Sequence, residues 1–510
     1  TCALPICLAL GMLSAIRRCL DLINQQGQSA ITLADIPAGD QATYAMIQRA
    51  DTVGVFQIES RAQMAMLPRL KPCCFYDLVI EVAIVRPGPI QGNMVHPYLQ
   101  RRRGLEKVQY PSIDLKRVLE RTLGVPIFQE QVMQIAMVAA GFSGSEADAL
   151  RRSMAAWARR GGLEHMHQRL VDGMLKRGYS KTFAEQIFDQ IRGFGEYGFP
   201  ESHAASFALL VYISCWMKCH HPAAFTCALL NAQPMGFYAP AQLVKDAQRH
   251  GVKVLPVDVR FSERESTLTR PEKGQPALRL GLHMVKGLGG NSGERIVRER
   301  ENLAYRDVHD LQHRAALGSR EMAALAEAAA LRSLAGHRHR ARWSIAAAPA
   351  QPADLLAGIP IPDQPVSIRP PSESDDLLAD YATTGLSLGR HPLAFIRAEL
   401  RRRRVRLATQ LAELPHGTHV RACGLVTMRQ RPMTASGTIF LTLEDETGSV
   451  NAVVWRRLWK RHRHTVLNAY LIAIDGTLES DGGVQHLIAR QIHDFTHLSP
   501  KLKTRSRDFC

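Results

Sequence analysis

Hydrophobic residues in the first half of the chain recur every three or four positions, from Met12 to about Ala232. This is the period of an α-helix with one buried face, so the segment is expected to fold mainly into helices. The clearest stripes are Val132, Ile135, Ala136 and Ala139, followed by Phe183, Ile187 and Ile191. Such stripes are typical of a helical core, and they predict structure rather than chemistry.

The period changes in the second half. Residues 251–282 indicate short strands with turns, and residues 346–376 are rich in Ala and Pro, as in a linker. Five strands are then predicted: Val420–Met428, Thr438–Glu444, Ser449–Trp455, Tyr470–Thr477 and Val484–Ile492. With a basic helical insert after Trp455, they predict an OB-like β-barrel, a fold that often binds single strands. The expected fold class is a multidomain α+β protein.

A glycine-rich turn lies between these two regions. Lys286-Gly287-Leu288-Gly289-Gly290 precedes a predicted helix from Gly293 to Glu301, and a second helix-turn-helix spans Ser319–Leu334. The pair resembles a tandem helix-hairpin-helix module, in which backbone N–H groups hold DNA phosphates without reading bases. The alternative is a plain loop between two helices.

The chain is strongly basic, with a formal net charge of +17 over 510 residues. This favours a polyanionic partner, most simply nucleic acid, because clustered Arg side chains supply phosphate contacts. The clusters are Arg101–Arg103, Arg151–Arg152, Arg159–Arg160, Arg338–Arg342, Arg401–Arg404 and Arg456–Arg463. Each cluster alone could equally be a solvated surface.

Composition also narrows the cellular setting and the chemistry. The sequence has no run of about 18 uncharged apolar residues, so no membrane contact and a cytoplasmic location are expected. The ten cysteines include no Cys-x-x-Cys pair, and reduced thiols are expected. Cys215, Cys219, His220 and His221 invite a metal interpretation, but no second ligand pair stands at zinc-site spacing, and no metal site is predicted.

The segment Tyr197–Phe207 carries a possible anion site. Gly198 and Pro200 interrupt the chain before an apolar run, so a helix is expected to begin with Ser202 as its N-cap. Ser202 and His203 would then project from a helix N-terminus, which attracts phosphate. The alternative for this Ser-His pair is an ordinary helix cap.

Five motifs follow one another along the chain: Val55–Ser60, Arg86–Pro89, Phe128–Met133, Ala147–Arg152 and Tyr197–Phe207. Their order and spacing resemble the fingers region of bacterial family-C DNA polymerases. Three further features resemble the error-prone, damage-inducible branch: Pro200-Glu201, Ala158–Gly162 and the Arg507-Asp508-Phe509 ending. The hairpin module, the linker and the OB-like domain also follow in that family's order.

Pattern and resemblance together predict a division into eight segments. These are residues 1–13, a palm remnant or unrelated sequence; 14–250, polymerase fingers; 251–282, a strand-rich connection; 283–345, the tandem helix-hairpin-helix module; 346–376, a linker; 377–417, a helical connector; 418–497, the OB-like domain; and 498–510, a basic tail.

The resemblance implies roles for particular residues. Arg151 and Arg152 would hold phosphate oxygens of the incoming deoxynucleoside triphosphate, for which the forked guanidinium is suited. Ser202 and His203 would lie near the same nucleotide. Lys286, Gly287 and Gly289 would hold the backbone of the template-primer duplex.

The resemblance also implies magnesium ions held by three palm aspartates. In the family, one of these aspartates lies two residues before the segment matched by Leu8–Leu13, where this chain has Ile6. The family's Asp-x-Asp pair would lie before residue 1. We therefore expect no catalytic residue and no metal ligand in this chain, and no polymerase activity from the chain alone.

Primed DNA and deoxynucleoside triphosphates are the expected partners. A sliding clamp and other mutagenesis proteins are further candidates, since Gln351–Leu356 has an acid before two apolar anchors, although it lacks an aromatic anchor and also fits a linker. Two alternatives stay open: a non-catalytic DNA-binding scaffold or remnant, and an RNA-binding protein that uses the OB-like domain. Lesion specificity and fidelity do not follow from the sequence.

Overall fold

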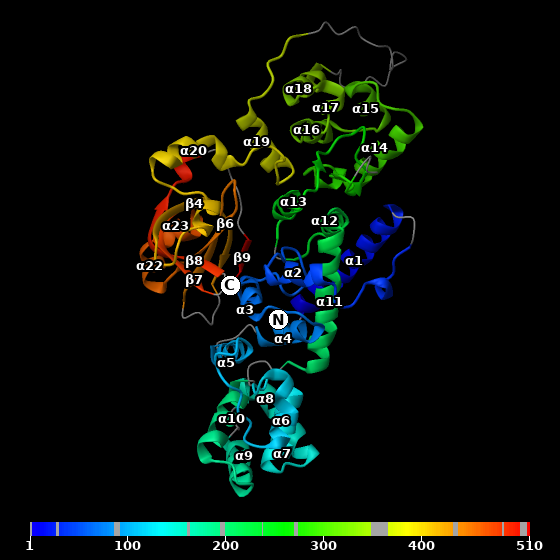
Figure 1. The fold of residues 1–510 in the computed structure, drawn as a ribbon. Helices are drawn as coiled ribbons and strands as arrows, with labels where there is room; N and C mark the ends of the chain where they lie inside the picture. Colours follow the sequence, from blue (N-terminus) through cyan, green and yellow to red (C-terminus); the bar gives the residue numbers. More distant parts are fainter. Residues whose placement is uncertain are drawn as a thin grey trace.

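The computed structural model of the chain describes residues 3–26, 30–85, 92–160, 164–193, 199–236, 238–269, 274–347, 366–431, 437–481, 484–499 and 507–509 (Figure 1). Some sequence features named above lie outside these residues in whole or in part. Among them are Arg86–Pro89, the end of Ala158–Gly162, the start of Tyr197–Phe207, Gln351–Leu356 and most of the predicted linker and basic tail. No helix in the described ranges is long and apolar enough to cross a membrane.

Helices form the first half of the chain, as predicted. They are α1 (Ala3–Gln26), α2 (Gln41–Gln48), α3 (Arg61–Leu70), α4 (Phe75–Ile84), α5 (Gly92–Arg102), α6 (Ile113–Leu119), α7 (Gln129–Ala140), α8 (Gly144–Arg160), α9 (Glu164–Lys176), α10 (Lys181–Gly193), α11 (Glu201–His220), α12 (Pro222–Asn231) and α13 (Pro240–Arg249). The long helix α11 packs on α4, and α1 packs on α12. Helices α6 to α10 form a separate lobe at the far end of α11 (Figure 1).

A glycine allows close packing within this lobe. Helix α9 crosses α7, and a Cβ atom on Gly173 would lie 2.2 Å from the carbonyl oxygen of Ala140. The side chain of Arg169 donates to the same Ala140 carbonyl over 3.2 Å and therefore satisfies an acceptor at the end of α7. The two helices are thus fixed against each other at one point.

Buried charges join three distant parts of the helical half. The ammonium group of Lys218, on α11, is 1% exposed and lies 3.0 Å from Asp51 and 2.8 Å from Asp246 on α13. His250 completes the group, with Nε2 2.7 Å from Asp51. The hydrogen bond with Asp51 raises the pKa of His250, although burial opposes this. We call these four residues the buried ionic cluster.

Short strands and a second set of helices follow. The strands β1 (Val254–Leu255), β2 (Thr267–Leu268) and β3 (Leu278–Arg279) form a small sheet in the order β1-β3-β2. The helices are α14 (Gly290–Asn302), α15 (Val308–Arg314), α16 (Ser319–Glu327), α17 (Arg332–Ala335) and α18 (Arg338–Ala347). This is the arrangement of two helical hairpins predicted from the sequence.

A connector of three helices leads to the last domain. These are α19 (Glu373–Thr383), whose first four residues belong to the predicted linker, α20 (Pro392–Arg402) and α21 (Ala408–Ala412). Ser372 caps α19 by accepting a hydrogen bond from the Asp375 N–H. The side chain of Arg338 on α18 forms ion pairs with Asp376 and Asp380 on α19, and so ties the connector to the hairpin module.

The last domain is the predicted five-stranded barrel. Its strands are β4 (His419–Gln430), β5 (Ile439–Glu444), β6 (Ser449–Val454), β7 (Leu471–Asp481) and β8 (Val484–Asp494), with a short β9 (Arg507–Phe509) parallel to β4. The order β5-β6-β8-β7-β4 closes because β4 also pairs with β5. The predicted basic insert is present as α22 (Arg456–Arg461) and α23 (Arg463–Asn468). Trp459 and Val466 anchor it in the barrel core.

Candidate nucleic-acid and nucleotide interface

The predicted arginine pair lies on α8 in the helical lobe. The carboxylate of Asp148 forms ion pairs with both guanidinium groups, at 2.9 Å from Arg151 and 3.0 Å from Arg152. The spacing of three and four residues places all three side chains on one helix face. Both arginine side chains stay substantially exposed, at 40% and 68%, so their outer N–H groups can meet a ligand. A phosphate would have to compete with Asp148.

The predicted N-cap of α11 is wrong. The helix begins at Glu201 with Pro200 as N-cap, and Ser202 is its second residue. The reason is local: Pro200 takes an extended conformation, and the Glu201 N–H donates to the carboxylate of Glu130 over 2.9 Å. A negative side chain therefore already occupies part of this helix terminus, where sequence reasoning expected a phosphate.

Ser202 and His203 are nevertheless exposed on the first turn of α11. The His203 ring lies between two aromatic rings, with centroid distances of 5.1 Å to Phe199 and 4.2 Å to Phe207. This fixes the imidazole in place and leaves it accessible. Among the described contacts, none joins Ser202 or His203 to the arginine pair on α8, so the two predicted halves of the nucleotide site do not touch each other.

The predicted glycine hairpin lies before α14. Gly287 has φ of +91°, which favours glycine, and Gly289 is the N-cap of α14. Within the described part of the chain, the N–H groups of Gly287 and Gly289 donate to no recorded acceptor. The two hairpins are linked through Ser292 and Glu321, which hydrogen-bond to each other. The geometry fits a phosphate-binding turn.

Lys286 makes internal contacts. Its Nζ lies 3.1 Å from the carbonyl oxygen of Ala382, and its backbone N–H donates to Thr383 over 2.9 Å. Both acceptors lie at the C-terminal end of α19, which carries partial negative charge. The side chain is exposed, but in this conformation it holds the connector rather than facing away from it.

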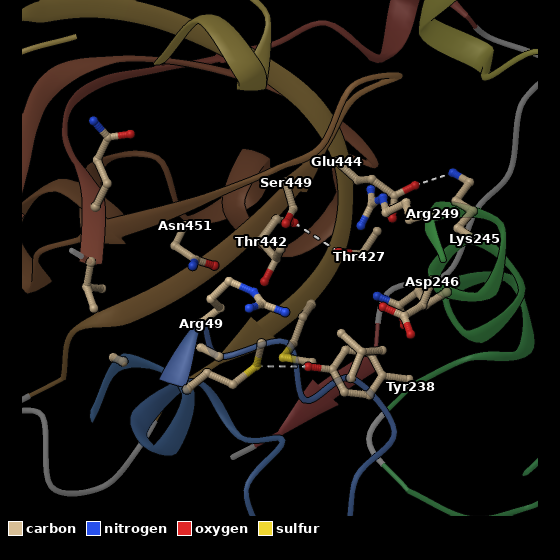
Figure 2. A pocket seen from close by; sticks show the side chains of 18 of the residues that line it. Arg49, Tyr238, Lys245, Asp246, Arg249, Thr427, Thr442, Glu444, Ser449 and Asn451 are labelled. Carbon is tan, nitrogen blue, oxygen red and sulfur yellow. Dashed lines mark hydrogen bonds and ion pairs between the residues drawn. The ribbon is translucent and has the colours of Figure 1, made fainter. Parts of the chain in front are cut away.

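A cavity of about 280 Å³, lined by charged, polar and apolar side chains, lies between the barrel and the helical half. Figure 2 shows Arg49 and Lys245 reaching into it from the helical side, opposite Thr442, Ser449 and Asn451 on the barrel strands. Strands β5 and β6 are the second and third of the barrel, the face that OB-folds use for oligonucleotides. Among the described residues, Arg49 and Arg249 have no hydrogen-bond or ion-pair partner through their side chains.

An ion pair spans this cavity and joins the two domains. Lys245 on α13 contacts Glu444 on β5, and His391 on the connector lies 3.5 Å from the same carboxylate. Burial alone would raise the pKa of Glu444, but the nearby imidazole of His391 and the charge of Lys245 lower it to about 2. Burial lowers the pKa of His391, which therefore stays neutral near pH 7.

Replacing Glu444 with Gln is expected to cost about 1–2 kcal/mol at pH 7, because a charge-assisted pair is lost. A carboxylate whose pKa is lowered on folding stabilises the protein above its ordinary pKa of 4.5 and loses this contribution as the pH falls toward 2. The difference between wild type and E444Q should therefore shrink over that interval in calorimetric unfolding. A difference that stays constant from pH 7 to pH 2.5 would contradict this electrostatic coupling.

Three clusters of side chains have metal-ligating atoms close together in the described ranges. They are Asp40-Cys219-His220, Cys73-Cys74-Asp77 and Asp51-Asp246-His250. Magnesium prefers six oxygen ligands, whereas each cluster includes Cys or His. Their carboxylates are also engaged by other groups; for example, Asp77 lies 2.7 Å from Arg102. None of these three clusters offers the all-oxygen ligand set that magnesium prefers.

Sequence reasoning missed the cavity residues Arg49, Lys245 and Arg249. Lys245 and Arg249 lie on α13, and Arg49 is the C-cap of α2, so each looks in the sequence like an ordinary solvent-exposed cation. The partner of Lys245 is 199 residues away, and a pairing of that kind leaves no local pattern.

Comparisons with known proteins agree with this domain order. Residues 12–178 match the family described as bacterial DNA polymerase III alpha subunit finger domain, residues 251–341 match a helix-hairpin-helix motif, and residues 412–495 match an OB-fold nucleic acid binding domain. The predicted finger, hairpin and barrel are therefore confirmed.

Curated relatives carry the name error-prone DNA polymerase. The chain is 59% identical over 503 residues to the protein of Pseudomonas fluorescens (strain Pf0-1), 57% to that of Pseudomonas paraeruginosa, and 53% over 520 residues to that of Methylococcus capsulatus. These matches cover 98% of this chain and 49–50% of each relative, so the chain spans about half the length of the curated relatives it matches. By its sequence and its three domains, this chain is a homologue of the bacterial error-prone DNA polymerases.

Proposed function

We propose that this chain supplies the finger and DNA-binding part of an error-prone DNA polymerase, which adds deoxynucleotides to a primer 3′ end on damaged templates. The observation that carries the proposal is the 53–59% identity along 98% of the chain to proteins named error-prone DNA polymerase. Because those relatives are twice as long, the activity is proposed for a complete protein that includes the rest of their length.

The parts of the chain support distinct steps. The exposed guanidinium groups of Arg151 and Arg152 would bind the triphosphate, and Ser202 and His203 would contact the same nucleotide from the first turn of α11. The free N–H groups of Gly287 and Gly289 would bind a phosphate of the primed duplex. The barrel would hold the unpaired template strand. Each role concerns binding and positioning, which supply much of the catalysis in phosphoryl transfer.

Polymerases of this kind generally use divalent metals, and we propose magnesium. We propose that its ligands lie outside this chain, since the sequence contains no Asp-x-Asp pair of the kind that the family resemblance implies. The purified chain is therefore expected to give no primer extension with magnesium and nucleotides. Metal-dependent extension by the purified chain would refute this part of the proposal. Extension that appears when a protein carrying the rest of the relatives' length is added would distinguish the polymerase part from a non-catalytic scaffold.

Replacing Arg151 with Ala is expected to weaken binding of a deoxynucleoside triphosphate about tenfold, because a charge-assisted hydrogen bond to phosphate is lost. Asp148→Asn should have the opposite effect, since it removes the carboxylate that competes for both guanidinium groups. Titration calorimetry with the nucleotide measures both, and binding of primed DNA should change less.

Arg117 provides the matched control for this experiment. It pairs with Asp114 at the same three-residue spacing and is 76% exposed on α6. If Arg117→Ala and Arg151→Ala weaken nucleotide binding equally, the effect comes from the change in net charge and not from a contact of Arg151. A weaker affinity in Asp148→Asn would contradict the proposed competition.

Gly287→Ala is expected to weaken binding of primed DNA several-fold. A Cβ at φ of +91° strains the turn, and the two N–H groups would move away from their phosphate-binding geometry. Gly336→Ala is the control, because Gly336 lies in the same module at φ of +82° with open space around its Cβ position. Fluorescence anisotropy with labelled primed DNA measures the difference. Similar affinities of the two variants would count against the hairpin as a DNA contact.

A further inference from the structure

The helical insert of the barrel differs from the other basic clusters of the chain. In the described ranges, each of the others contains an arginine paired with a carboxylate, as in Arg102 with Asp77, Arg338 with Asp376 and Arg403 with Glu399. The side chains of Arg159 and Arg160 lie outside the described residues. These pairs reduce the charge that the clusters can offer to a ligand.

The insert has no such compensation. No recorded ion pair or hydrogen bond engages the side chains of its five cations, which are all exposed: Arg456, Arg457, Lys460, Arg461 and Arg463. The sequence contains no Asp or Glu between Glu446 and Asp475, so no acid lies nearby along the chain either. Burial and the charge of Arg461 lower the pKa of the neighbouring His462, as expected in a positive environment.

The cations share one face of α22. At 100° per residue, Arg456, Arg457, Lys460 and Arg461 fall within an arc of roughly 140°, while Trp459 points away from this arc. Trp459 is 8% exposed and packs in the barrel core, which fixes the orientation of the short helix. The cationic face is therefore held outward by packing.

An aromatic ring borders this face. Trp455, the N-cap residue of α22, is 54% exposed, whereas Trp216 and Trp459 are 8% exposed. Figure 1 shows α22 on the side of the barrel that faces away from α3 and α13 and hence away from the interdomain cavity. In the described part of the chain, no packing contact accounts for the exposure of the Trp455 ring. We call Trp455 and the five cations the insert surface.

We propose that the insert surface is a second binding site for single-stranded DNA, separate from the barrel face that lines the interdomain cavity. The cations contact successive phosphates, and an unpaired base stacks on Trp455. A duplex fits less well, because its bases are already stacked on one another. This inference goes beyond the proposed function, which assigns the template strand to the barrel without locating this site.

The test compares two fourfold variants of the full chain. The first replaces Arg456, Arg457, Lys460 and Arg461 with Gln. The control replaces four exposed arginines that have carboxylate partners: Arg17, Arg117, Arg390 and Arg402. Both variants lose four positive charges, and all substituted side chains are exposed, so thermal unfolding should stay close to that of the wild type.

We expect the insert variant, but not the control, to bind a 20-nucleotide oligo-dT at least tenfold more weakly. Each lost phosphate contact lowers the slope of log affinity against log salt by about 0.7, so the slope should fall by up to about 2.8. Trp455→Ala should weaken binding about tenfold and Trp455→Phe much less, while Trp343→Ala, at a similarly exposed ring, should have little effect.

Equal affinity and slope in the two fourfold variants would overturn the proposal. Loss of binding to duplex or to oligo-U that matches or exceeds the loss for oligo-dT would also overturn it, since the surface would then be a general polyanion or RNA site. Failure here leaves the proposed function open, because that is tested at Arg151 and Gly287.

Discussion

Replacing Lys218 with Met is expected to lower the free energy of unfolding by about 3–5 kcal/mol. The substitution keeps the length of the side chain and removes its charge, which leaves Asp51 and Asp246 facing each other with only His250 between them. An uncompensated carboxylate in a partly buried site is more costly than the loss of a surface ion pair. Lys218 is 1% exposed, so water cannot replace the ammonium group.

Urea unfolding, followed by the helical signal, measures this effect. Arg17→Met is the control, because Arg17 pairs with Asp21 at 79% and 52% exposure and should cost less than about 0.5 kcal/mol. Asp51→Asn in the Lys218→Met background should recover part of the loss, since it leaves His250 with only the carboxylate of Asp246 to compensate. A loss below 1 kcal/mol for Lys218→Met would mean that the carboxylates are solvated or protonated at little cost.

Gly173→Ala is expected to destabilise the helical lobe by about 3 kcal/mol. Within a helix this change normally stabilises by about 0.5–1 kcal/mol, so helix propensity predicts the opposite sign. At Gly173, however, the new Cβ would lie 2.2 Å from the Ala140 carbonyl oxygen, and relief requires α9 to move away from α7. The hydrogen bond from Arg169 to the same oxygen would be disturbed as well.

Gly144→Ala, at the start of α8, is the matched control. Its Cβ position has nothing within 4 Å, and α8 belongs to the same lobe. We expect no loss of stability there. Thermal unfolding of the two variants therefore separates propensity from packing, and a stabilising effect of Gly173→Ala would show that the α7–α9 crossing is looser than the structure indicates.

Much of the fold could be predicted because its signals are local. The helical stripe at Val132, Ile135 and Ala139 is buried on α7, and the alternating strand from Ile439 to Glu444 is β5. Each element needs only its own period of apolar side chains to be recognised. The charge partner of Arg151 was also within reach, because Asp148 precedes it by three residues on the same helix.

Other features depended on contacts between distant segments. Ser202 is a residue type that often caps helices, but Pro200 is the N-cap of α11. The N–H of Glu201 donates to Glu130, which lies 71 residues earlier in the sequence. Likewise, Lys286 resembles a DNA-binding lysine, yet it contacts the end of α19. Local sequence cannot reveal a competitor that comes from another part of the chain. The roles of these residues in binding stay predictions.

The buried ionic cluster also affects when the helical half can finish folding during its synthesis. Asp51 and His250 are 199 residues apart in the sequence. At a synthesis rate of about 5–20 residues per second, roughly 10–40 s pass between the appearance of these two side chains. During that time Asp51 lacks its final partners, since Lys218 is itself made only late in the interval, and the helical half cannot complete its core on the ribosome until α13 has been made. Slow synthesis over residues 220–250 would therefore prolong exposure of this core to chaperones and proteases.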